Sequence, residues 1–128
     1  MKIKRIYNLE EHLVCNKVLV IYGARQVGKT TLLKNFLAKT ELKYKFDTGE
    51  NILTKNLLSS GDLNNIKKYA EGFELIAIDE AQNIPNIGMA LKFMVDHIDN
   101  IKIIVTGSSS FELAGQIGDP LTLSLIHI

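Results

Sequence analysis

The chain has 128 residues, with 15 basic and 14 acidic side chains, a formal net charge of +1 and a hydrophobic fraction of 46%. These values are typical of one globular domain, and they exclude disordered, collagen-like and membrane-protein compositions as well as a broad basic surface for nucleic acid. Because no apolar run approaches the roughly 20 residues of a bilayer span and the N-terminus has no apolar signal region, we expect a cytoplasmic location.

The first predicted element is a strand over residues 18–22, a mostly β-branched apolar run that ends at Gly23. The lone cysteine just before it, Cys15, has no partner in the chain and is expected to be buried by packing. Apolar side chains recur at helical spacing over residues 30–39, which predicts a helix with one face on a sheet. Residues 44–46 predict a second short strand, closed by turn-forming residues at 47–49.

The next stretch, residues 52–69, has a helical pattern that is interrupted at residues 59–62. We therefore predict two short helices, with Asp62 as the N-cap of the second. Residues 75–78 form a second strongly apolar run and predict the third strand.

The last predicted elements are a helix and a strand. An amphipathic helix is expected over residues 89–98, after a loop that contains Pro85 and Gly88. Residues 101–105 predict a fourth strand. Apolar strands that alternate with helices indicate an α/β fold of three layers, with a mainly parallel sheet covered on both faces.

The segment from Gly23 to Thr30 fits the pattern G-x-x-x-x-G-K-S/T between a predicted strand and a predicted helix, as a phosphate-binding loop requires. Gly23 and Gly28 would let backbone amides approach phosphate oxygens, and the helix would add its N-terminal amides and dipole. Lys29 would place a positive charge on the β- and γ-phosphates, and the Thr30 hydroxyl would bind Mg²⁺. The alternative is a glycine turn that carries Lys-Thr by chance.

The acidic pair Asp79 and Glu80 follows the third strand, at the edge where open α/β sheets bind ligands. Asp79 would hold the Mg²⁺ shell, and Glu80 would orient or deprotonate the attacking water. Such a glutamate separates hydrolysing ATPases from kinases, and the chain has no Asn-Lys-x-Asp motif for guanine. The missing guanine motif makes ATP the expected nucleotide. The alternative for the acidic pair is that it only caps the next segment.

Other polar residues near this edge have open roles. Thr106, Ser108 and Ser109 follow the fourth strand, where they could sense the γ-phosphate or hold the water, or simply form a turn. Arg25 could contact phosphate or a neighbouring subunit, or be a solvated surface side chain. Gln82 could relay the state of the γ-phosphate, or be structural.

Four segments together, residues 23–33, 78–82, 91–96 and 105–110, resemble a family of bacterial and archaeal AAA-superfamily ATPases that usually carry a C-terminal domain of unknown function. The resemblance implies the ASCE division of P-loop folds, with the fourth strand between the first and third and a fifth strand beyond the first. It also implies Mg²⁺-dependent ATP hydrolysis, and any homo-oligomer or protein partner would involve the C-terminal part. The implied nucleotide contacts are Gly23, Ala24, Arg25, Gln26, Val27, Gly28, Lys29, Thr30 and Thr31.

Members of that family are far longer, so we expect residues 1–122 to be an ATPase core that is incomplete at its C-terminus. Residues 123–128 match the in-frame translation of the start of a transposon adapter used in sequencing libraries. We expect this tail to be non-native, which would leave the first strand as an exposed sheet edge. A genuine apolar C-terminal strand is the alternative. Because Arg5 and Arg25 are the only arginines, an arginine finger would come from missing sequence or from Arg25 in a neighbouring subunit.

Overall fold

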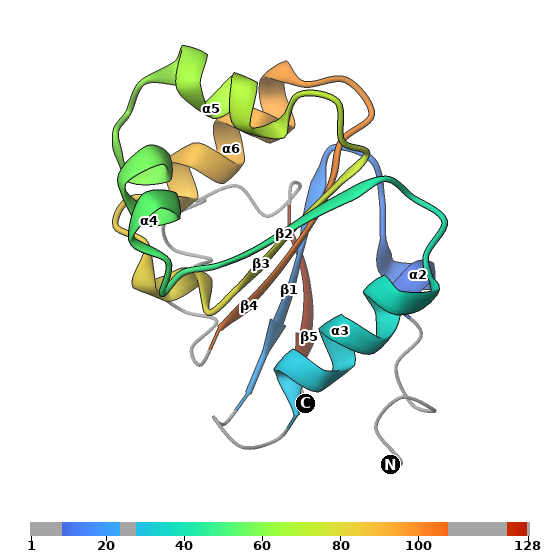
Figure 1. The fold of residues 1–128 in the computed structure, drawn as a ribbon. Helices are drawn as coiled ribbons and strands as arrows, with labels where there is room; N and C mark the ends of the chain where they lie inside the picture. The colour runs from blue at the N-terminus through green and yellow to red at the C-terminus, as the bar shows by residue number, and fades with distance from the viewer. Residues whose placement is uncertain (1–8, 24–27, 108–122, 128) are drawn as a thin grey trace.

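The structure is a computed structural model that describes residues 9–23, 28–107 and 123–127 (Figure 1). In chain order its elements are α2 (Leu9–His12), β1 (Lys17–Tyr22), α3 (Lys29–Lys39), β2 (Tyr44–Thr48), α4 (Ile52–Ser59), α5 (Leu63–Ala70), β3 (Leu75–Asp79), the 3-10 helix η1 (Ala81–Asn83), α6 (Ile87–His97), β4 (Lys102–Gly107) and β5 (Leu123–His127). Within these ranges no helix has the length and apolar character needed to cross a bilayer.

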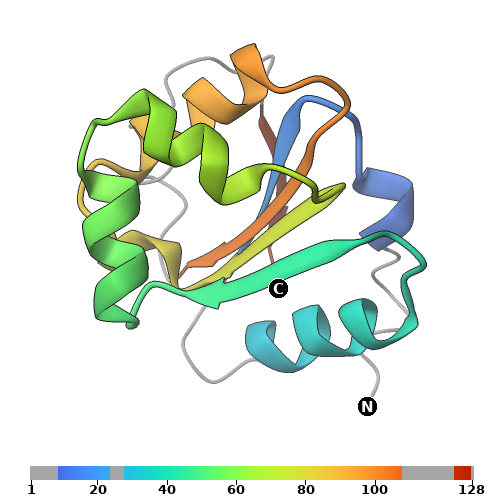
Figure 2. The same cartoon turned by 45° about the horizontal axis from the view of Figure 1, so that its top comes forward.

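The strands form one sheet in the order β2-β3-β4-β1-β5, and every pairing is parallel. The fourth strand therefore lies between the first and the third, as the family resemblance implied. Helices α4, α5 and α6 cover one face, and α3 covers the other (Figure 2). The prediction of a three-layer α/β fold with a parallel sheet is confirmed.

The two faces of the sheet belong to separate apolar clusters because side chains alternate along each strand. In β1, Val18 and Val20 pack with α4, α5 and α6, whereas Leu19 and Ile21 pack with α2 and α3. All four are at most 1% exposed. Burial on both faces explains why this strand is a continuous apolar run rather than an alternating one.

Two predicted boundaries were wrong. Asp47 and Thr48 belong to β2 rather than to a turn, because the parallel pairing with β3 continues as far as Thr48 opposite Asp79. Gly88 lies buried inside α6 rather than in a loop, since that helix already begins at Ile87. The two-helix prediction for residues 52–69 is confirmed, and the Asp62 carboxylate caps α5 by accepting from two backbone amides.

The expectation for Cys15 was also wrong. Its side chain is exposed, and its sulfur accepts a hydrogen bond from Lys102 Nζ at 3.3 Å. The residue lies in the turn before β1, outside the stretch of that strand that both helical layers cover.

Residues Leu123–His127 form β5, which pairs in parallel with β1 from Val18 to Tyr22. The expectation that β1 would be an exposed edge is therefore wrong. The segment suits the edge position because Ile126 is only 5% exposed in the α3-side cluster, while Leu125 is 50% exposed. The adapter origin of these residues concerns the DNA sequence and stays a prediction.

Asn16 ties the turn before β1 to the end of α6. Its Nδ2 donates to the carbonyl oxygens of Val95 and Ile98, each at 2.8 Å, and its Oδ1 accepts from the backbone N–H of Asn100 at 3.2 Å. The two carbonyls lie at the helix end, where intrahelical donors run out. Asn16 has a φ of 62°, a left-handed conformation that asparagine tolerates.

We expect Asn16→Gly to lower the free energy of unfolding by about 2 kcal/mol, because two carbonyls lose their donors. Glycine accepts a positive φ, so backbone strain does not add to the loss. Asn100→Gly is the matched control, since Asn100 has a similar φ of 61°, and it should change stability by no more than about 0.5 kcal/mol. Urea denaturation measures both variants, and equal losses would contradict the assignment.

Candidate functional site

The candidate site lies at the carboxyl edge of the sheet (Figure 1). Gly23 follows β1, Asp79 is the last residue of β3, and Thr106 is the next-to-last residue of β4. Because the strands are parallel, these ends meet at one edge, where α/β folds bind ligands. Helix α3 begins at Lys29, after the loop that starts at Gly23.

Two hydroxyls converge on the carboxylate of Asp79, which is 7% exposed. Thr30 Oγ1 donates to it, at 2.8 Å from Oδ2 and 3.1 Å from Oδ1. Thr106 Oγ1 donates to Oδ1 at 2.5 Å and accepts from the backbone N–H of Glu80 at 2.9 Å. The wholly buried Thr106 therefore connects β4 to the end of β3 through both its donor and its acceptor.

The oxygen atoms of Thr30 and Asp79 suit Mg²⁺, a hard cation that prefers carboxylate and other oxygen ligands. Within the described ranges no group of three or more His, Cys, Asp or Glu side chains is placed to hold a metal ion. A magnesium ion here would thus need further oxygens from water or from a phosphate, which is its usual way of binding at phosphate sites. The donor set fits a cation that arrives with a phosphate ligand.

Lys29 is the first residue of α3 and is only 2% exposed. Its Nζ donates to the carbonyl oxygen of Gly23 at 3.1 Å, so the ammonium group lies beside the residue that follows β1. Gly28 caps the helix with a φ of 88°, a left-handed conformation that favours glycine. The start of α3 therefore places a positive charge and the positive end of a helix dipole at the same edge of the sheet as Asp79.

Glu80 has a left-handed backbone, with φ 53° and ψ 48°, which is uncommon for a residue other than glycine. Its carboxylate Oε1 accepts a hydrogen bond from Gln82 Nε2 at 2.7 Å. Gly49 packs against it from the end of β2, and the Gly49 N–H donates to the Asp79 carbonyl at 2.7 Å. A Cβ atom on Gly49 would overlap the carbonyl oxygen of Glu80.

We expect Gly49→Ala to lower the free energy of unfolding by about 3 kcal/mol, because either the end of β2 or the Glu80 peptide must move. Gly72→Ala is the matched control, since Gly72 has a φ of +86° but nothing within 4 Å of an added Cβ atom. That change should cost about 1 kcal/mol through backbone strain alone. Urea denaturation measures the free energy of unfolding of both variants. A smaller loss for Gly49→Ala than for Gly72→Ala would refute the close contact.

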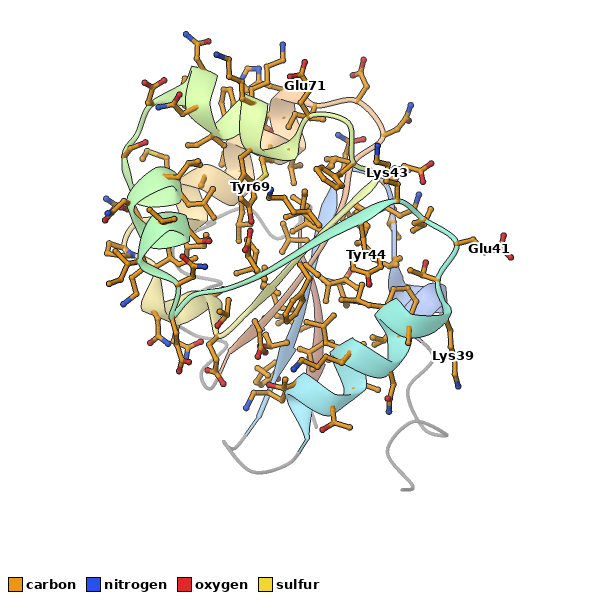
Figure 3. The ribbon with its side chains drawn as sticks, in the orientation of Figure 1. Lys39, Glu41, Lys43, Tyr44, Tyr69 and Glu71 are labelled. Atoms are coloured by element: carbon orange, nitrogen blue, oxygen red, sulfur yellow. The ribbon has the colours of Figure 1, made fainter. Side chains whose placement is uncertain are left out.

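Asp47 anchors the end of β2 to the helical layer. Its Oδ2 accepts a hydrogen bond from the hydroxyl of Tyr69, a residue of α5 whose side chain extends toward the sheet (Figure 3). Burial raises the pKa of Tyr69 above its ordinary value, and the hydrogen bond and negative charge of Asp47 raise it further. The tyrosine therefore remains a donor, and it fixes the strand two residues before Gly49.

The structure brings together most of the site residues predicted in the described part of the chain, namely Gly23, Gly28, Lys29, Thr30, Asp79, Glu80 and Thr106. Thr31 is exposed on α3. Ala24, Arg25, Gln26, Val27, Ser108 and Ser109 lie outside the described residues. The role of Gly49 was not predicted, because only the parallel register of β2 and β3 places this glycine against Glu80.

Comparison with known proteins agrees with this architecture. Residues 15–126 match a family described as AAA domain. An uncharacterized protein of Mycobacterium tuberculosis is 31% identical over 106 residues, which cover 81% of this chain but 22% of that protein. An uncharacterized protein of Mycobacterium bovis gives the same values. This chain thus spans about 22% of the length of the curated relatives that it matches.

Two solved structures share the fold at low sequence identity. Domain III of the Thermotoga maritima replication initiation protein DnaA has a TM-score of 0.59 at 18% identity, covering 87% of this chain and 54% of that chain. The replication initiator DnaA bound to AMPPCP and single-stranded DNA has a TM-score of 0.58 at 18% identity, covering 92% and 43%. These likenesses concern the fold, whereas the match over residues 15–126 shows that the chain belongs to the AAA domain family.

Proposed function

We propose that this chain binds ATP with Mg²⁺ and hydrolyses the nucleotide at the carboxyl edge of its sheet. The observation that carries the proposal is the convergence of the Thr30 and Thr106 hydroxyls on the buried Asp79 carboxylate. These groups lie at the start of α3 and next to Glu80, so a phosphate-binding helix terminus and a candidate base share one edge.

Binding would use the positive end of α3. Backbone amides in the first turn of a helix have no partner inside the helix and attract phosphate oxygens. Lys29 would add its ammonium charge, and Thr30 and Asp79 would hold Mg²⁺ through their oxygen atoms. A magnesium ion bound there would neutralise negative charge that develops on the phosphates during transfer.

Hydrolysis would use Glu80 as the general base. Its carboxylate would accept a proton from a water molecule whose oxygen forms a bond to the γ-phosphorus. The bond between that phosphorus and the β,γ-bridging oxygen breaks, which gives ADP and inorganic phosphate. Thr106 would support this step without contacting the nucleotide, because its hydroxyl fixes both the Asp79 carboxylate and the backbone of Glu80.

Two comparisons support the proposal. The chain belongs to the AAA domain family, and a DnaA structure with the same fold was determined with the ATP analogue AMPPCP. We propose no contact with DNA for this chain, because its 15 basic and 14 acidic side chains are nearly balanced.

The test is calorimetric titration of the folded chain with ATP, in Mg²⁺ and in excess chelator, with phosphate release followed in parallel. We expect ATP to bind more tightly in Mg²⁺, GTP to compete poorly, and phosphate to accumulate. Circular dichroism first establishes that the chain is folded. If a folded chain bound no ATP in either buffer, the assignment of this edge as a nucleotide site would be wrong.

A further inference from the structure

The backbone of Glu80 is fixed from two sides. Its N–H donates to the Thr106 hydroxyl at 2.9 Å, and its carbonyl packs so closely against Gly49 that no Cβ atom fits there. The residue adopts a left-handed backbone, with φ 53°, which persists only where the surroundings enforce it. Such a backbone fixes where the side chain starts but leaves several rotamers open to the carboxylate.

Gln82 restrains the carboxylate itself. Its Nε2 donates to Glu80 Oε1 at 2.7 Å, from a position on η1 two residues further along the chain. The other amide atom, Gln82 Oε1, is buried and has no hydrogen-bond partner in the described part of the structure. Burying an acceptor without a donor is unfavourable. A hydrogen bond to Gln82 Oε1 is therefore not what fixes the orientation of the amide.

The Glu80 carboxylate explains the amide orientation. If the Gln82 amide were reversed, its oxygen would face Glu80 Oε1, and two acceptors would repel each other. The observed orientation therefore gives the amide its hydrogen bond to Glu80, whereas the buried Gln82 Oε1 has no partner among the described residues. This arrangement suits a side chain whose role is to hold the carboxylate.

We propose that Gln82 is a positioning residue that holds Glu80 Oε1, so that the second carboxylate oxygen is oriented to take a proton from water. The inference rests on the proposed function of Glu80 as the general base. A base held in one orientation loses less freedom in the transition state, and small misplacements of reacting groups are costly. Gln82 thus acts through Glu80 and need not touch the nucleotide.

The test compares Gln82→Met with Asn83→Ala. Methionine has a similar length but cannot donate to the carboxylate, whereas the exposed side chain of Asn83 lies on the same 3-10 turn. We expect Gln82→Met to lower kcat by about 10- to 100-fold with little change in KM or in ATP affinity. Asn83→Ala should leave kcat unchanged. An unchanged or increased kcat for Gln82→Met would overturn the inference.

A second readout is independent of turnover. In nuclear magnetic resonance spectra the side-chain NH₂ signals of Gln82 should be shifted from random-coil values in the wild type and should move toward them in Glu80→Ala. If wild-type protein showed no phosphate release but this shift were present, the proposed function would fail while the contact stood. If phosphate were released but the Gln82 signals did not respond to Glu80→Ala, the inference alone would fail.

Discussion

Replacing Lys29 by alanine is expected to weaken ATP binding by about 10- to 100-fold. A hydrogen bond to a charged group contributes about 1.5–3 kcal/mol, which corresponds to this range in the dissociation constant. Lys29 begins α3 and is only 2% exposed, so little water would screen its interaction with phosphate oxygens. Calorimetric titration with ATP and Mg²⁺ at one fixed salt concentration gives the ratio of dissociation constants.

The matched control is Lys39→Ala, which removes the same charge from the exposed last turn of the same helix. It should leave the ATP dissociation constant within about twofold, because a solvated charge at the far end of α3 is screened. Since Lys29 is buried, circular dichroism and thermal unfolding must show that the alanine variant still folds. Equal effects of the two substitutions would mean that Lys29 contributes only its net charge, which would contradict the assigned site.

The predictable part of the fold is the part that local pattern determines. The strands β1, β3 and β4 are short apolar runs because both faces of the sheet are covered, and each was predicted to within one or two residues. The start of α3 was predicted to within one residue, because a glycine followed by a Lys-Thr pair is typical of a helix that begins after a phosphate-binding loop. Parallel strand direction then brings the ends of β3 and β4 to the same edge of the sheet as Gly23 and the start of α3.

The unpredicted features depend on partners that are distant in sequence. Asp47 and Thr48 have turn-forming side chains, yet they extend β2 because β3 offers a parallel partner as far as Asp79. The left-handed backbone of Glu80 is supported by Thr106, which is 26 residues further along the chain. A strand at residues Leu123–His127 was only the alternative to a non-native tail, because its pairing depends on the open edge of β1, about 100 residues away. No window of sequence around these residues contains that information.

Replacing Glu80 by glutamine is expected to lower kcat for ATP hydrolysis by about 10²- to 10⁴-fold, the usual contribution of general-base catalysis. The amide has nearly the same shape but cannot accept a proton from water. ATP affinity should change little, because Asp79 and Thr30 would still hold Mg²⁺. Single-turnover phosphate release and calorimetric ATP titration measure the two quantities separately. Glu50→Gln is the matched control, since its exposed carboxylate lies shortly after the end of β2.

The pattern of outcomes separates an ATP-hydrolysing enzyme from a nucleotide-gated interaction switch. An enzyme would lose turnover in Glu80→Gln, keep its ATP affinity, and be unaffected by Glu50→Gln. A switch with negligible turnover would show no kinetic difference between wild type and Glu80→Gln, and ATP would order the region around Gln82 in both. A large loss of ATP affinity in Glu80→Gln would contradict both, because the chain's phosphate and magnesium contacts are assigned to Lys29, Thr30 and Asp79. Only the outcome expected of an enzyme, lost turnover with retained ATP affinity, is consistent with Thr106 and Gly49 serving to hold a general base in place.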